Sequence, residues 1–324
     1  MTGGDTVALP DSEKLERLCE VLRSREPPNP DPQVQRAHFA AVMSATPPAD
    51  QVLITREHVA GIPIEWLVPA EASSARTLLY LHGGGYVMGS PDTARRLAAR
   101  IATLTGARVA LPDYRLAPEH PFPAALLDAT AAYRRLVGEV CPPSELVVAG
   151  DSAGGGLAVA TLLAAHDAGL PMPVAVACLS PWTDLTLSGA TLRTNAASDP
   201  QVRYHHLARW ATDYLAGHDA EDPLASPGFG ELTGLPPMLI HAGAAELLAD
   251  DALLLAGAAR RAGVEVTCEL YDRMIHVWHG FFPGLPEATA ALERLAEWLD
   301  RRWRTAASAT GTCSPVRVPP TAVR

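Results

Sequence analysis

The chain has 324 residues, of which 48% are hydrophobic and 19% are charged, so it fits a folded globular protein and excludes a disordered one. Its formal net charge of −10 disfavours binding to nucleic acid. No apolar run reaches the roughly 18 residues that a membrane-spanning helix requires, and the N-terminal segment lacks the basic start and apolar stretch of a secretory signal.

The cysteines are odd in number, widely spaced and without a C-x-x-C pair; they are Cys19, Cys141, Cys178, Cys268 and Cys313. This spacing predicts neither a disulfide framework nor a zinc site, and we expect no metal. Free thiols are typical of a reducing compartment, so we predict a cytoplasmic protein.

The N-terminal part of the chain, residues 1–50, is predicted to form helices. Leu15, Leu18 and Leu22 recur at the spacing of one helical face, and a Pro-rich break at 27–32 divides the segment in two. We expect these helices to join a cap over the core.

Eight β-strands are predicted from short apolar runs bounded by turn signals. The first two form an antiparallel hairpin around Ala60-Gly61, and from there strands alternate with helices. Such alternation is typical of the α/β class, with a mostly parallel sheet and helices on both faces. The predicted strands lie at 52–59, 62–68, 77–81, 107–111, 146–149, 174–179, 238–241 and 264–271.

Residues 182–225 interrupt this alternation, because Leu207, Trp210 and Tyr214 follow helical spacing and no clear strand is present. We interpret the stretch as a cap insertion over the carboxyl ends of the strands, where open α/β folds bind ligands. The alternative is an ordinary packing insertion. The predicted division is cap helices at 1–50, a core at 51–181 and 226–304, the insertion at 182–225 and a disordered tail at 305–324.

A G-x-S-x-G motif at 150–154 places Ser152 between an apolar strand and an Ala/Leu-rich helix. A serine at so sharp a turn is held away from the sheet and exposed, as a nucleophile requires. The flanking glycines fit, because a tight elbow has no space for side chains. The alternative, a glycine-rich turn of a nucleotide-binding fold, is disfavoured because neither G-x-G-x-x-G nor G-K-[ST] is present at this turn.

The HGGG segment at 82–85 directly follows the strand TLLYL, at the strand end that faces the same side as Ser152. Glycines leave backbone N–H groups uncovered, and acyl transfer needs such donors for its oxyanion. The N–H of Ala153, after the candidate nucleophile, adds a further donor. We interpret His82 as a structural hydrogen-bonding residue and not as a base.

A serine nucleophile needs a histidine base and an acid that orients it, and in this fold class the order along the chain is Ser, acid, His. Glu246 lies in the loop after the strand at 238–241 and is the preferred acid, with Asp250 as the alternative. We favour His276 as the base, and assign His279 to the pocket or to packing.

Several further segments occur in a fixed order: HGGG (82–85), DYRLAPEHPFPAAL (113–126), GDSAGG (150–155), LSPWTDL (179–185), DPLASP (222–227) and MIHVWHGF (274–281). In these segments the sequence resembles the bacterial hormone-sensitive-lipase-like (family IV) carboxylesterases, a branch of the α/β-hydrolases, over residues 30–303. The resemblance implies an α/β-hydrolase fold with a helical cap, and a nucleophile, base and oxyanion donors at Ser152, His276, Gly83, Gly84 and Ala153. The family's usual acid is an aspartate, so Glu246 is a departure.

We therefore predict a serine carboxylesterase that cleaves small to medium acyl esters through an acyl-enzyme and needs no metal or organic cofactor. An acyl transferase or a tailoring hydrolase of a biosynthetic pathway would carry the same residues. A non-catalytic small-ligand receptor is a third hypothesis, and His276 argues against it, since the related plant gibberellin receptors lack the working histidine. The expected partner is a small-molecule ester, and the resemblance allows a homodimer joined at a sheet edge.

Four aromatic residues are candidates for the substrate pocket, although each could equally lie in the core: Tyr86, Trp182, Trp210 and Tyr214. Asp113, Arg115 and Glu119 lie together in the segment at 113–126. We interpret them as a buried ion-pair scaffold and not as catalytic groups.

Overall fold

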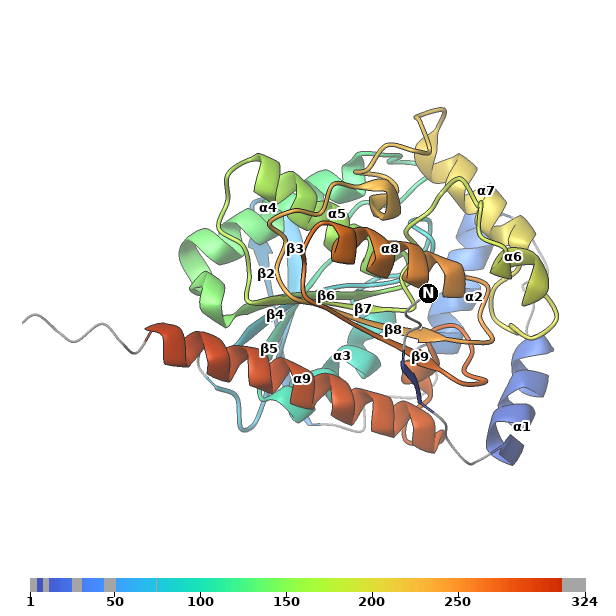
Figure 1. Ribbon diagram of the computed structural model, residues 1–324, viewed down its shortest axis with the longest axis horizontal. Coiled ribbons are helices and arrows are strands. Elements are labelled where there is room, and N and C mark those ends of the chain that lie inside the picture. The colour runs from blue at the N-terminus through green and yellow to red at the C-terminus, as the bar shows by residue number, and fades with distance from the viewer. Residues whose placement is uncertain (1–4, 8–11, 25–30, 44–50, 74, 311–324) are drawn as a thin grey trace, which may run out of the picture.

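The computed structural model describes residues 5–7, 12–24, 31–43, 51–73 and 75–310. A twisted nine-stranded sheet runs through the middle of the molecule, with helices above and below it (Figure 1). The strands are β1 (Asp5–Val7), β2 (Val52–Val59), β3 (Ile62–Pro69), β4 (Thr77–Leu81), β5 (Arg108–Pro112), β6 (Leu146–Asp151), β7 (Ala175–Leu179), β8 (Met238–Gly243) and β9 (Val266–Tyr271).

The strand order across the sheet is β1-β9-β8-β7-β6-β4-β5-β3-β2. The pairs β2–β3 and β3–β5 are antiparallel and all other neighbours are parallel, which confirms the predicted mostly parallel sheet. The chain leaves β4 toward β5 on one side and returns to β6 on the other. This reversal opens a crevice at the carboxyl ends of β4 and β6, where such folds bind ligands.

The α-helices are α1 (Ser12–Arg23), α2 (Pro32–Met43), α3 (Pro91–Thr105), α4 (Ala124–Arg135), α5 (Ala153–Asp167), α6 (Thr191–Thr194), α7 (Tyr204–Leu215), α8 (Ala249–Arg261) and α9 (Pro286–Thr310). Short helical turns of other types are η1 (Leu136–Val140), η2 (Pro143–Glu145), η3 (Pro227–Phe229) and η4 (Trp278–Phe281). In the part of the chain that the structure describes, no helix is long and apolar enough to cross a membrane.

The helices bury the sheet from both faces and so create two apolar cores. Leu79 and Leu81 of β4 face the core beneath α4, α5 and α8, whereas Leu78 and Tyr80 face the core beneath α3 and α9. This alternation follows from the two-residue period of a strand, and all four side chains are fully buried. Each fully buried side chain of this size contributes about 1.5–3 kcal/mol relative to exposure, so the central strand is held firmly in place.

Two local signals in the sequence explain where elements begin and end. Ala60 and Gly61 have φ values of 53° and 82°, which close the predicted hairpin between β2 and β3. Pro91 is the first residue of α3, and Gly106 ends this helix with φ 65°.

The described residues depart from the predicted strand count and from the predicted tail. A ninth strand, β1, pairs in parallel with β9 at the sheet edge. Three residues are too few to show a period-two pattern, so the strand was not predicted. Helix α9 continues to Thr310, which corrects the first six residues of the predicted disordered tail; residues 311–324 lie outside the described residues.

The predicted buried ion-pair scaffold is also wrong, because its three members are exposed, and Arg115 and Glu119 pair with residues outside it. Arg115 binds Asp128 of α4 with both ends of its guanidinium, at 2.9 and 2.8 Å. Glu119 binds Arg36 of α2 at 2.6 Å. Asp113 is exposed at the end of β5. These contacts fasten surface segments, and Arg36 in particular ties α2 to the core.

Helices α1, α2, α6 and α7 gather at one end of the molecule, beyond the carboxyl ends of the central strands (Figure 1). Two of them come from the first fifty residues and two from the stretch between β7 and β8. These four helices therefore lie at the end of the molecule where the sheet loops after β4 and β6 end.

Candidate active site

Ser152 sits at a sharp turn between β6 and α5, as the motif predicts. Its φ of 53° and ψ of −123° belong to a region that side-chain-bearing residues rarely adopt, at a cost of about 1–3 kcal/mol. A Cβ on Gly150 would collide with the carbonyl oxygen of Gly154, and one on Gly154 with that of Leu81. Only glycine therefore fits on both sides of the serine.

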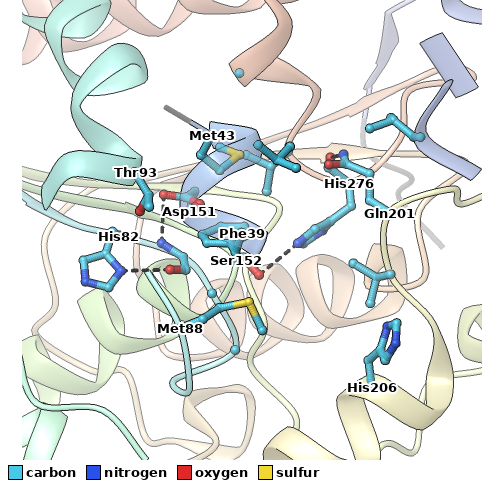
Figure 2. A pocket seen from close by; sticks show the side chains of 18 of the residues that line it. Phe39, Met43, His82, Met88, Thr93, Asp151, Ser152, Gln201, His206 and His276 are labelled. Atoms are coloured by element: carbon cyan, nitrogen blue, oxygen red, sulfur yellow. Dashed lines mark hydrogen bonds between the residues drawn. The ribbon is translucent and has the colours of Figure 1, made fainter. Parts of the chain in front are cut away.

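The imidazole of His276 faces this serine from the loop after β9 (Figure 2). Its Nε2 atom lies 2.9 Å from Oγ of Ser152, although the two residues are 124 positions apart in the chain. This distance lies within the range that proton transfer between a nucleophile and its base requires.

Glu246 approaches the other side of the same imidazole. Its Oε2 lies 3.6 Å from Nδ1 of His276, which is an ion-pair distance slightly longer than a hydrogen bond. The hydroxyl of Ser180 donates to the same Oε2 at 2.7 Å and accepts from the N–H of Val277 at 3.0 Å. The structure thus brings Ser152, His276 and Glu246 into one line, with Ser180 supporting the acid.

The alternative candidates for acid and base are engaged elsewhere. Asp250 accepts the N–H of Thr191 at 3.0 Å. His279 is fully buried, and its Nε2 lies 3.2 Å from Nδ1 of His241. His279 is therefore a packing residue beneath the loop that carries His276.

Burial and neighbouring charges shift the pKa values of His276 and Glu246 in opposite directions. Burial alone would lower the pKa of His276, but the adjacent Glu246 carboxylate outweighs burial and holds the pKa above its usual value. Burial raises the pKa of the Glu246 carboxyl, against the effects of His276 and Ser180. A carboxylate in this position stabilises the imidazolium that forms when the base takes a proton.

The HGGG loop lies beside Ser152. Contrary to the prediction, the N–H of its first glycine, Gly83, is not free to donate to an oxyanion. The N–H of Gly83 donates to Oδ1 of Asp151 at 3.1 Å, so this amide is occupied. Within the described chain, the N–H groups of Gly84 and Gly85 have no acceptor. The N–H of Ala153 is in the first turn of α5, where no intrahelical acceptor exists. The candidate oxyanion donors are therefore Gly84, Gly85 and Ala153.

His82 has the structural role that the sequence analysis assigned to it. Burial lowers its pKa to about 4, so the ring is neutral at pH 7. Its Nδ1 lies 2.8 Å from the carbonyl oxygen of Gly83, and the ring stacks on Tyr114 at a centroid distance of 4.2 Å. These contacts fix the start of the glycine loop.

A cavity of about 410 Å³ opens above Ser152 and His276. Figure 2 shows Phe39, Met43 and Met88 pointing into it near the serine, with His206 and Gln201 on another side. The apolar part of the wall includes six side chains of α1 and α2: Leu18, Val21, Leu22, Phe39, Val42 and Met43. The polar part includes Gln35, His38, Gln201, Arg203 and His206. No group of three or more metal-ligating side chains occurs among the described residues.

Comparison with known proteins fits this geometry. A family model described as the alpha/beta hydrolase fold matches residues 78–280, which is more than half of the chain. An acetyl-hydrolase of Streptomyces hygroscopicus is 45% identical over 290 residues, which cover 89% of this chain and 95% of the relative.

This chain belongs to the α/β-hydrolase fold family.

Solved structures place this hydrolase near one branch of the family. A crystal structure of EstE5 soaked with p-nitrophenyl butyrate is 42% identical, with a TM-score of 0.87, covering 91% of this chain and 100% of that one. A crystal structure of an esterase from the bacterial hormone-sensitive lipase family is also 42% identical, with a TM-score of 0.88 and the same coverage. The hydrolase is thus a member of this bacterial esterase branch.

Of the four aromatic residues predicted to line the pocket of this hydrolase, only Trp210 does so. Tyr86, Trp182 and Tyr214 are buried behind the cavity wall, which corrects the prediction. Tyr86 stacks on Tyr214 with a centroid distance of 3.9 Å and lies 6.0 Å from Trp182. These rings pack α7 against the core of the hydrolase. They thereby hold Trp210, which is on α7, in the cavity wall.

Several residues at the site were not predicted from the sequence. Phe39 and Met43 repeat at helical spacing in α2, which shows an apolar face but not that it covers a cavity. Ser180 follows β7 just as Ser152 follows β6, and its position at a strand end was the available signal. Neither Gln201 nor Asp199 belongs to a motif, so their contacts emerge only from the fold.

Proposed function

We propose that this chain hydrolyses carboxylic esters, with Ser152 as nucleophile, His276 as general base and Glu246 as the orienting acid. The observation that carries the proposal is the 2.9 Å separation between Nε2 of His276 and Oγ of Ser152 at a strained elbow beneath a cavity. Similarity to esterases and an acetyl-hydrolase supports the reaction class.

The proposed reaction has two halves. Oγ of Ser152 attacks the ester carbonyl while Nε2 of His276 takes the hydroxyl proton, and the same nitrogen then protonates the leaving alcohol. Water hydrolyses the acyl-enzyme with His276 again as base. The amides of Gly84, Gly85 and Ala153 stabilise the oxyanion in both halves, and one such donor is typically worth about 10²–10³-fold in rate.

The proposed substrates are esters with small to medium acyl groups. A cavity of about 410 Å³ suits a small ligand better than a long triglyceride. We assign the cap to the helices of residues 1–50 and to the insertion at 182–225, because α1, α2 and α7 supply most of the wall beyond the sheet loops. The core is then 51–181 and 226–304.

The test is turnover of p-nitrophenyl butyrate by the full-length chain and by Ser152→Ala. We expect measurable hydrolysis, loss of turnover in the variant and an unchanged melting temperature. A fluorophosphonate should label the wild type at Ser152 and leave the variant unlabelled. Turnover retained by Ser152→Ala would refute the nucleophile. An unlabelled wild type would favour a receptor, and an acyl product on an added alcohol in place of free acid would favour a transferase.

Two further proposals concern the cell and the assembly. We propose a cytoplasmic location, because Cys19, Cys141, Cys178 and Cys268 are free and buried thiols. We also propose a homodimer through the sheet edge at β2, where Leu53 is 65% and Ile54 41% exposed. Light scattering should give twice the chain mass, and Leu53→Lys should give a monomer; a monomeric wild type would reject the dimer.

A further inference from the structure

The segment between α6 and α7 makes several hydrogen bonds to the loop that carries Glu246. The side-chain amide of Asn195 donates to the carbonyl oxygens of Ala244 and Glu246, each at 2.9 Å. The hydroxyl of Ser198 donates to the carbonyl oxygen of Ala245 at 2.9 Å. Three successive residues of the acid loop are therefore held by a part of the chain outside the sheet.

Asp199 extends this contact to the next residue. Its Oδ2 accepts the N–H of Leu247, directly after Glu246, at 3.0 Å. Its Oδ1 accepts the N–H groups of Gln201 and Val202, at 2.9 and 3.3 Å. The carboxylate is fully buried, and it does not line the cavity. It thus fastens the acid loop from one side without access to a bound ester.

The same segment also reaches the loop of the base. The side-chain amide of Gln201, two residues after Asp199, donates to the carbonyl oxygen of His276. In Figure 2 the labelled Gln201 lies directly beside His276. One short stretch, residues 195–201, therefore contacts the backbone at both Glu246 and His276.

We propose that Asp199 is a positioning residue of the active site, which holds the Glu246 loop against His276 and places a second negative charge near the imidazole. The proposal rests on the proposed ester hydrolysis through Ser152. Because Glu246 stands 3.6 Å from Nδ1, small movements of its loop decide whether the acid and base meet in a hydrogen bond. A displacement of about 1 Å at such a site can cost about 10²-fold in rate.

The charges around His276 support this role. Burial lowers the pKa of the imidazole, and the carboxylates of Glu246, Asp199 and Asp151 raise it, in that order of effect. His279 also faces the imidazole, but burial holds its own pKa well below the usual value, so it is neutral. Asp199 therefore adds to the stabilisation of the imidazolium that Glu246 supplies.

Three other groups face Asp199. Its charge raises the pKa of Cys19 in α1 and of Glu246. The guanidinium of Arg203 donates to the backbone carbonyl of Asp199 at 2.7 Å, and no ion pair joins Arg203 to a carboxylate in the described part of the chain. Replacing the carboxylate with an amide keeps the bond from Arg203 to the backbone carbonyl and removes the charge that acts on Cys19 and Glu246.

The experiment is Asp199→Asn in the full-length enzyme. An amide has one oxygen, so if it keeps the bonds from Gln201 and Val202, its NH2 group must oppose the N–H of Leu247. The matched control is Asp184→Asn. Asp184 is also buried, and among the described residues its carboxylate accepts only from Thr186 and Ser188 of its own turn, for example the N–H of Thr186 at 2.8 Å and the hydroxyl of Ser188 at 2.6 Å.

We expect Asp199→Asn to lower kcat for p-nitrophenyl butyrate by about 10- to 100-fold, with KM nearly unchanged. The acidic limb of the kcat/KM profile should move to lower pH, because a negative charge near His276 is lost. Asp184→Asn should lose comparable thermal stability and keep the wild-type kcat and acidic limb. Asn195→Ala, which removes the two bonds to the acid loop but no charge, should lower kcat and leave the acidic limb in place.

A wild-type kcat and an unmoved acidic limb in Asp199→Asn would overturn the proposal, and so would an equal loss in the Asp184 control. If Asp199→Asn does not fold, a wild-type kcat in Asn195→Ala would overturn it, and a lowered kcat there would support it. These outcomes differ from a failure of the proposed function, in which the wild type itself neither hydrolyses the ester nor reacts with the fluorophosphonate.

Discussion

The hydroxyl of Ser180 donates a hydrogen bond to Oε2 of Glu246 at 2.7 Å, from the end of a strand that carries neither the nucleophile nor the acid. Oγ of Ser180 in turn accepts the N–H of Val277, the residue after His276, at 3.0 Å. One buried hydroxyl therefore joins the acid loop after β8 to the base loop after β9. The Glu246 carboxylate is therefore held at its tip by this bond.

Ser180→Ala should lower kcat for p-nitrophenyl butyrate, because the Glu246 carboxylate loses its fixed orientation. It should also reduce the free energy of unfolding by about 1–3 kcal/mol, since a buried N–H is left without its acceptor. Ser226→Ala is the control, because Ser226 is equally buried and accepts the N–H of Leu185 away from the site. Equal effects of both variants on kcat would reject the role of Ser180.

Glu246→Gln should reduce kcat strongly, by up to about 10⁴-fold, because the neutral amide neither fixes the imidazole tautomer nor stabilises the imidazolium. Asp250→Asn should have little effect, since Asp250 binds the N–H of Thr191. Steady-state kinetics of both variants decides between the two acids. A strong loss in Asp250→Asn with an active Glu246→Gln would assign the acid to Asp250.

The rate of fluorophosphonate labelling should fall as the pH decreases, because His276 accepts a proton only in its neutral form. The pKa of His276 is raised, so the midpoint of this fall should lie above the ordinary histidine value of about 6.5. In Glu246→Gln the midpoint should move to lower pH. A wild-type midpoint below that of a free histidine would contradict the proposed ion pair.

Phe39→Ala should enlarge the cavity at the apolar wall that α2 contributes. We expect kcat/KM for p-nitrophenyl octanoate to rise relative to that for the butyrate, because the longer acyl chain gains space. Val34→Ala on the same helix is the control, since Val34 is 39% exposed and does not line the cavity. An unchanged ratio in Phe39→Ala would place the acyl group elsewhere.

The sequence was sufficient to predict which residues lie close together where a motif directly follows a strand. The glycine loop and Ser152 follow β4 and β6, which are neighbours in the sheet, so their proximity could be predicted from the alternation of strands and helices. Glu246 and His276 follow two later strands, β8 and β9, which are also neighbours in the sheet, so the proximity of their loops could be predicted for the same reason. The residues at the ends of parallel strands necessarily meet at one edge of the sheet.

The predictions were wrong where a side chain distant in the sequence determines what a residue contacts. Gly83 was expected to donate to the substrate, but the carboxylate of Asp151 takes its amide. The rings of Tyr86, Trp182 and Tyr214 have the composition of a pocket, yet they stack on one another behind its wall. Residue type and helical spacing indicate that a side chain is buried, and they do not indicate against what.

The reacting groups and most of the cavity wall come from different parts of this molecule. Ser152, the glycine loop and His276 stand on loops of a rigid sheet, whereas α1 and α2 line part of the cavity from outside the sheet. Changes in these two outer helices can therefore alter which ester is accepted without altering how it is cleaved. Such a division would let substrate specificity change while the reacting groups stay the same.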